Sequence, residues 1–172
     1  MINKQRAIGV LIALLSVAAL PATAQAAQAA APVPKGCAST TGYSSDGWHS
    51  GELTVCFTED TRYDGSSGSY VPSPAAQVRG RCWTKGIFWN EKNCKFDADL
   101  TLRKDGVEVW KKRVGKRTDF QHTQDTATTS LWSCNGPGRY TLTVDAIDMY
   151  TLNEPYSIKV DPAPVTVTAD GC

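Results

Sequence analysis

Residues 94–114 read CKFDADLTLRKDGVEVWKKRV and carry the clearest structural pattern of the chain. From Cys94 to Arg103, apolar and polar side chains alternate, which is the period-2 pattern of a strand with one buried face. The pair Asp105-Gly106 follows and favours a two-residue type I′ turn, because glycine adopts a positive φ without steric cost. The stretch therefore predicts an antiparallel hairpin that resumes at Val107.

The turn also fixes the register of this hairpin. A two-residue turn predicts three cross-strand pairs: Lys104 with Val107, Arg103 with Glu108, and Leu102 with Val109. This register places opposite charges outside and apolar side chains inside, whereas a three-residue loop would set Leu102 against Glu108. It also places Lys111 opposite Leu100, so we expect a bulge or a strand end near Trp110.

Shorter strand patterns, separated by turn signals, fill the rest of the chain. We expect further strands over residues 52–58, 77–84, 126–134, 140–146, 156–160 and 165–169. Residues 37–51 are rich in turn formers, and residues 59–74 are expected as a loop because Pro72 and Pro74 cannot donate a ladder hydrogen bond. Without an amphipathic helix, about seven or eight strands indicate an all-β antiparallel β-sandwich.

One segment resembles a known family. Residues 135–144, NGPGRYTLTV, resemble the entry to a late strand of immunoglobulin-like sandwich domains, and the resemblance assigns the tyrosine-corner role to Tyr140. Leu142 stands where antibody-type domains carry a cysteine of the disulfide between the sheets, so the resemblance concerns architecture alone. It implies an immunoglobulin-like, disulfide-bonded sandwich.

The start of the chain has the features of a secretory signal peptide. Lys4 and Arg6 precede an apolar run over residues 7–20, which is shorter than the roughly 20 residues of a membrane-spanning helix. Small-residue cleavage sites follow at four alanines: Ala24, Ala26, Ala29 and Ala31. Ala26 is the preferred last residue of the signal, and the other three sites are alternatives.

The expected organisation has three parts. They are a signal peptide at residues 1–26, a flexible lead-in at residues 27–36 and a β-sandwich domain at residues 37–172. This organisation predicts a secreted, extracellular protein, with association to the cell envelope as the alternative. No transmembrane segment is expected after removal of the signal, and we expect a monomer.

Charge argues against a polyanion as the general partner. The chain has 18 basic and 17 acidic residues, and Lys4 and Arg6 lie in the expected signal. The processed protein is therefore close to neutral. Nucleic-acid binding depends on a basic surface, so it is not expected.

All six cysteines follow the signal, which is typical of structural disulfides in an exported chain. We expect sequential pairing: Cys37 with Cys56, Cys82 with Cys94, and Cys134 with Cys172. The spacing alone leaves other connectivities open. Zinc ligation is the alternative, but zinc sites use close pairs such as C-x₂-C and the chain has none.

No catalytic constellation is recognisable in the sequence. His49 and His122 are the only histidines, and neither stands in a metal-ligand spacing. The Ser-rich residues 65–69 lack the nucleophile-elbow motif. Asp97 and Asp99 fall on the outer face of an expected strand, where a solvated surface explains them better than glycoside hydrolysis. We therefore expect no enzyme activity, no cofactor and no resident metal.

Two segments are candidates for ligand binding. The first is Ile87-Phe88-Trp89, which would form an aromatic anchor if exposed and would otherwise cap the core from its loop or bent strand. The second is a basic run beside Trp110, made of Lys111, Lys112, Arg113, Lys116 and Arg117. Clustered cations could bind an anionic glycan or an acidic protein, but lysines also protect the edge of a sheet from aggregation.

These observations predict a non-catalytic secreted binding module whose partner is an extracellular protein or glycan. A structural protein of the cell envelope is the second hypothesis. A secreted hydrolase, or an inhibitor of a protease, is the third, although no sequence feature marks a reactive loop.

Overall fold

A computed structural model describes residues 35–117, 125–131, 134, 136–153 and 156–171. The expected signal peptide, nearly all of the lead-in, His122 and Cys172 lie outside the described residues. Within the described part the fold is all-β and antiparallel, as predicted, with nine strands in place of seven or eight. The strands are β1 (Gly36–Tyr43), β2 (His49–Asp64), β3 (Ser69–Lys85), β4 (Trp89–Lys104), β5 (Val107–Arg117), β6 (Asp125–Ser130), β7 (Arg139–Asn153), β8 (Tyr156–Val160) and β9 (Val165–Asp170).

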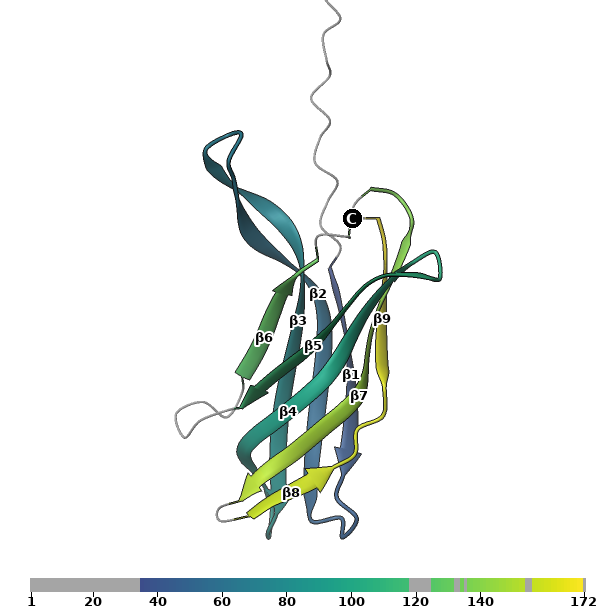
Figure 1. Ribbon diagram of the computed structural model, residues 1–172. Coiled ribbons are helices and arrows are strands. Elements are labelled where there is room, and N and C mark those ends of the chain that lie inside the picture. Colours follow the sequence, from purple (N-terminus) through teal and green to yellow (C-terminus); the bar gives the residue numbers. More distant parts are fainter. Residues whose placement is uncertain (1–34, 118–124, 132–133, 135, 154–155, 172) are drawn as a thin grey trace, which may run out of the picture.

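The strands form one continuous sheet that folds over on itself and is nearly barrel-shaped (Figure 1). One part has β3 between β2 and β6, with β1 beyond β2. The other has β4 between β5 and β7, and β7 also pairs with β8 and β9. The first residues of β4 pair with β3 before the strand crosses to the other part. The apolar core fills the space between the two parts.

The central hairpin has the predicted turn. Asp105 and Gly106 both have positive φ, 50° and 85°, as a type I′ turn requires. The first two predicted pairs, at Lys104 and Arg103, are confirmed. The third is wrong: Leu102 pairs with Trp110, because the register shifts at this point and leaves Val109 as the extra residue of the predicted bulge.

Two further sequence predictions are wrong. Residues 37–43, expected as part of a turn-rich stretch, belong to β1 at an edge of the sheet, where Thr40 and Gly42 occupy inward positions that longer apolar residues fill elsewhere. The expected loop at residues 59–74 is instead a two-stranded continuation of β2 and β3, closed by a turn at residues 65–68. Pro72 is tolerated because the outer edges of an isolated ribbon carry no ladder.

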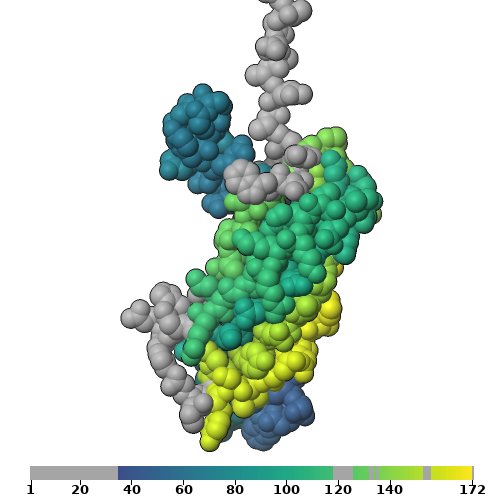
Figure 2. All heavy atoms as spheres, in the orientation of Figure 1, coloured from purple at the N-terminus to yellow at the C-terminus, as the bar shows by residue number. Residues whose placement is uncertain are grey.

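We call residues 61–72 the arm. Figures 1 and 2 show that it projects away from the body of the domain. Its strands pair only with each other, and Tyr63 and Tyr70 stand directly opposite with ring centroids 5.5 Å apart. This aromatic pair explains why the ribbon persists beyond the core.

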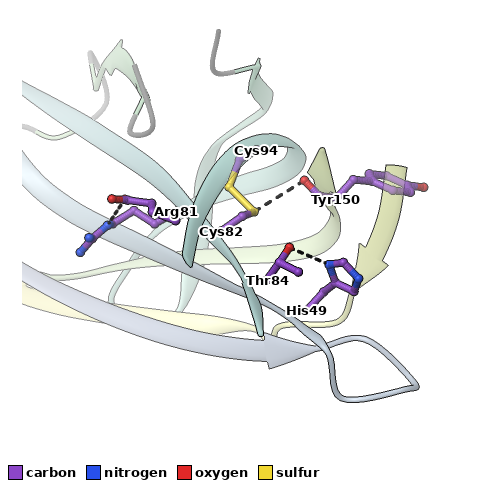
Figure 3. The surroundings of a disulfide bond; sticks show 7 residues. His49, Arg81, Cys82, Thr84, Cys94 and Tyr150 are labelled. Atoms are coloured by element: carbon purple, nitrogen blue, oxygen red, sulfur yellow. Dashed lines mark hydrogen bonds and ion pairs between the residues drawn. A yellow bond between two sulfur atoms is a disulfide. The ribbon is translucent and has the colours of Figure 1, made fainter. Parts of the chain in front are cut away.

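Two of the predicted disulfides are confirmed. Cys37–Cys56 joins directly paired residues of β1 and β2 on the outer face, whereas Cys82–Cys94 is fully buried. In Figure 3 the latter links β3 to β4, and the Sγ of Cys82 lies 3.6 Å from the carbonyl oxygen of Tyr150 on β7. Cys134 is also disulfide-bonded, and its expected partner, Cys172, lies outside the described residues.

Glycine at inward positions lets the two parts of the sheet approach closely. A Cβ added at Gly80 of β3 would lie 2.6 Å from Cδ1 of Phe96 on β4. A Cβ at Gly51 of β2 would lie 2.7 Å from Val160 and 2.8 Å from the sulfur of Met149. These residues are buried in a close-packed core, so a larger side chain has no space at either position.

We predict that Gly80→Ala destabilises the domain by about 1 to 3 kcal/mol, because Phe96 must move to admit the methyl group. Gly65→Ala is the control, since nothing lies within 4 Å of a Cβ added there. Chemical denaturation of both variants checks this prediction. Equal stability of the two would contradict the close packing described above.

We also predict that Cys82→Ala/Cys94→Ala lowers the free energy of unfolding by about 2 to 5 kcal/mol. Removal of Cys37 and Cys56 should cost less, because that bridge lies on the outer face and its loss opens no cavity in the core. Thermal melts of both double variants and of the fully reduced protein measure the effect. A melting temperature that reduction leaves unchanged would contradict it.

Candidate functional site

The first sequence candidate is exposed. Ile87, Phe88 and Trp89 are 95%, 79% and 44% exposed at the turn between β3 and β4. The carbonyl oxygen of Phe88 holds this turn, because it accepts hydrogen bonds from the amide of Gly86 at 2.9 Å and from the side-chain amide of Asn90 at 3.0 Å. Hydrogen bonds therefore stabilise the turn, and the three apolar side chains remain exposed to solvent.

Two further aromatic residues lie beside this turn. Tyr43, at the end of β1, has its ring centroid 6.3 Å from that of Trp89. Trp48 precedes β2, and its carbonyl oxygen accepts a 2.7 Å hydrogen bond from the amide of Lys85, whose Nζ lies 5.8 Å from the Trp48 ring centroid. Both side chains are more than half exposed. We call Tyr43, Trp48, Ile87, Phe88 and Trp89 the aromatic end.

The loop that presents Trp48 is held by a small polar network. Asp46 accepts hydrogen bonds from the hydroxyl of Ser44 at 2.5 Å and from the amide of Trp48 at 2.9 Å, and these hold the pKa of Asp46 below its ordinary value. The amide of His49 donates to the Ser44 hydroxyl at 3.0 Å. These hydrogen bonds stabilise the loop without the indole of Trp48, which is exposed and can contact a partner.

A shallow groove of about 300 Å³ adjoins the aromatic end on the outer face of β1, β2 and β3. It is lined by Thr41, Tyr43, Ser50, Glu52, Trp83 and Trp89. The register explains the set, because Tyr43, Ser50 and Trp83 lie in one row across the three strands and Thr41 and Glu52 lie in the next. Neighbours in a row share a face, so their side chains converge.

Two charged residues near the groove differ in their partners, because among the described residues Arg81 is ion-paired and Glu52 is not. Arg81 stands opposite Glu52 in the register, but its Nε bonds Glu91 at 3.0 Å and its guanidinium lies 5.0 Å from the Trp83 ring centroid. Glu52 accepts a 3.5 Å hydrogen bond from the Thr54 hydroxyl and makes no ion pair with another described residue. The groove thus holds a half-buried carboxylate with acceptor capacity to spare.

The second sequence candidate, the basic run, lies on β5, and the structure does not bring it to the aromatic end. Lys111 and Arg113 each bond Asp99 at 3.0 Å, and Arg113 also bonds Asp148 at 3.0 Å. Lys112 points the other way and donates to the Thr129 hydroxyl of β6 at 3.3 Å. Lys111, Lys112 and Arg113 are therefore engaged within the molecule.

The remaining members of that candidate have different surroundings. Trp110 is partly buried and packs against the core from β5. Lys116 and Arg117 are exposed at the end of the strand, opposite Phe96 and Lys95 of β4. The basic run therefore alternates between the two faces of an edge strand and does not form one patch.

His49 and Asp99, two titratable residues considered in the sequence analysis, are both engaged within the fold. His49 is buried, and its Nδ1 lies 3.1 Å from the Thr84 hydroxyl (Figure 3). Asp99 is paired with two cations, and no group of three or more His, Cys, Asp or Glu residues in the described chain is placed to hold a metal ion. In the same ranges, no helix is long and apolar enough to cross a membrane.

Comparison with protein-family models, with curated proteins and with solved structures finds no match. Functional inference therefore depends on the geometry of the aromatic end and its groove. Tyr43, Trp48, Glu52 and Trp83 were missed by the sequence analysis. Trp83 and Glu52 had a usable signal, since each neighbours an inward-pointing residue, Cys82 or Leu53, on an expected strand and so had to point outward.

The Asp99 cluster predicts a pH dependence of stability. Hydrogen bonds from Lys111 and then from Arg113 lower the pKa of Asp99 in the folded protein. Its contribution to stability is therefore complete above the unfolded pKa of about 3.9 and is lost as the pH falls through the lower folded value. Asp99→Asn should be less stable than the wild type at pH 7, and the difference should shrink as the pH falls below about 4.

Urea denaturation over a pH series measures this difference. Asp170→Asn is the control, because Asp170 is exposed and makes no ion pair with a described residue. A stability difference for Asp99→Asn that is constant with pH would show that the ion pairs do not stabilise the fold.

Proposed function

We propose that this protein is a secreted, non-catalytic binding module that holds an extracellular protein or glycan at its aromatic end. The carrying observation is the exposure of five large apolar side chains on two connections of the sheet that lie beside each other. A soluble domain exposes such a cluster at a cost, and clusters of this kind mark sites of interaction. Buried aromatic anchors dominate the affinity of most interfaces.

The construction of the site supports the same proposal. Hydrogen bonds of the backbone and of Ser44, Asp46 and Asn90 hold both connections, so the aromatic side chains are free to contact a partner. Little conformational entropy is then lost on binding, because the loops are already ordered. A rigid, disulfide-bonded scaffold that presents ordered apolar groups is suited to recognition.

Export is part of the proposal. The signal-like residues 1–26 and the disulfides support a secreted protein, because disulfides persist in oxidising compartments. The immunoglobulin-like assignment is also proposed. Tyr140 is fully buried and its hydroxyl lies 3.5 Å from the carbonyl oxygen of Gly136, four residues upstream, which is the contact expected of a tyrosine corner.

The test compares two double variants of the processed, oxidised protein. Phe88→Ala/Trp89→Ala should stay folded and lose about tenfold or more in affinity for its partner, because each side chain can bury a large apolar area. Tyr63→Ala/Tyr70→Ala removes an equally exposed aromatic pair on the arm and should bind like the wild type. Immobilised protein is exposed to the native extracellular medium and to a panel of polysaccharides, and retained material is quantified.

Retention that Phe88→Ala/Trp89→Ala abolishes and the arm variant preserves would support the aromatic end as the binding site. Equal retention by all three proteins would contradict it. Circular dichroism and thermal melts of the variants establish that the fold is intact. Retention in a cell-wall fraction would distinguish an envelope-associated protein from a freely diffusing module.

A further inference from the structure

We propose that the groove beside the aromatic end binds a neutral polysaccharide, with the sugar rings lying across β1, β2 and β3. This inference rests on the proposed function and names its ligand class. It concerns a sheet face instead of the turn at residues 86–88, and it therefore makes separate predictions.

Three aromatic rings border the groove, and each comes from a different strand. Tyr43 ends β1, Trp83 lies near the end of β3 and Trp89 begins β4. Because strand parity puts all three side chains on the outer face, their rings flank one shallow surface. A pyranose ring has a face of C–H groups that packs on aromatic rings, while its hydroxyls project from the edge. Tyrosine and tryptophan suit such contacts because each joins an apolar body to a polar atom.

Polar groups lie between these rings. Ser50 is buried at the level of the sheet, and in the next row Thr41 is exposed and Glu52 is half-buried. An ionised carboxylate accepts several hydrogen bonds, and the hydroxyls of Ser and Thr both donate and accept. A sugar carries several hydroxyls on adjacent carbons, so it can satisfy these groups together.

Charge selects a neutral sugar over an acidic one. The carboxylate of Glu52 has no cationic partner among the described residues, while the adjacent Arg81 is held by Glu91 at 3.0 Å. An anionic ligand would bring a like charge to Glu52, whereas hydroxyl donors are favoured there. Arg79 stands one row further along the same face, opposite Thr54, and lies outside the residues that line the groove.

The shape of the groove selects a polymer over a small ligand. Pockets for small molecules enclose most of the ligand surface, but this groove is shallow and is bordered by the exposed aromatic end. It crosses three neighbouring strands, which spans roughly 10 Å at a strand spacing of about 4.8 Å. A chain of several sugar units can extend along such a surface and continue beyond its ends.

The experiment measures retention of the processed protein on insoluble cellulose, chitin and β-1,3-glucan, with polygalacturonate as the acidic comparison. The wild type should be retained on at least one neutral polymer. Trp83→Ala should weaken binding about tenfold or more, and Glu52→Gln, which keeps the size of the side chain, should weaken it severalfold.

A second set of controls separates folding from binding. Trp83 is half-buried, so its replacement can affect stability, and the melting temperature of Trp83→Ala is measured. If Trp83→Ala is destabilised, Glu52→Gln provides the test. Tyr63→Ala/Tyr70→Ala should bind the polymer like the wild type. Unchanged retention of both groove variants would overturn the inference.

The outcomes also distinguish this inference from the proposed function. If no neutral polymer retains the protein, or only polygalacturonate does, the polysaccharide groove is wrong. If a protein of the extracellular medium is then captured and its capture depends on Phe88 and Trp89, the binding module stands with a protein partner. If neither class is captured, both proposals fail.

Discussion

The whole architecture depends on the place where β4 leaves one part of the sheet and enters the other. The strand pairs with β3 only over residues 89–92, and the buried Cys82–Cys94 bridge then holds the two strands together as they separate. The same crossing brings Phe96 over Gly80, where a side chain would collide. A covalent link and a missing side chain thus cooperate in closing the sheet around a single core.

This crossing also accounts for the position of the candidate site. A strand that must turn back within three residues leaves Ile87 and Phe88 beyond the last paired residues, Lys85 and Trp89, where neither part of the sheet can cover them. The end of β1 and the start of β2 lie beside this turn and add Tyr43 and Trp48. The aromatic end is therefore a consequence of how the sheet closes, and the groove follows from the register of the strands that reach it.

Local sequence predicted some of this arrangement and could not predict the rest. The hairpin at Asp105-Gly106 was predictable because turn chemistry and alternation specify a contact between neighbours in the chain. The bulge at Val109 was anticipated from a charge that would have faced the core. β1 was missed because small and polar residues occupy both of its faces, and the groove was missed because Tyr43 and Trp83 meet only through β2, a pairing that no local pattern encodes.

Because of the arm, the number of neighbouring strands that pair with β2 and β3 changes along their lengths. In the body of the domain, β2 and β3 also pair with β1, β4 or β6 and cover the core. Their backbone amides there exchange with solvent only when much of the domain opens. In the arm, residues 61–72, the same two strands pair only with each other, and an isolated pair of strands has marginal stability in water. The ribbon can therefore melt from its tip while the core stays intact, so a single continuous strand spans two independent units of unfolding.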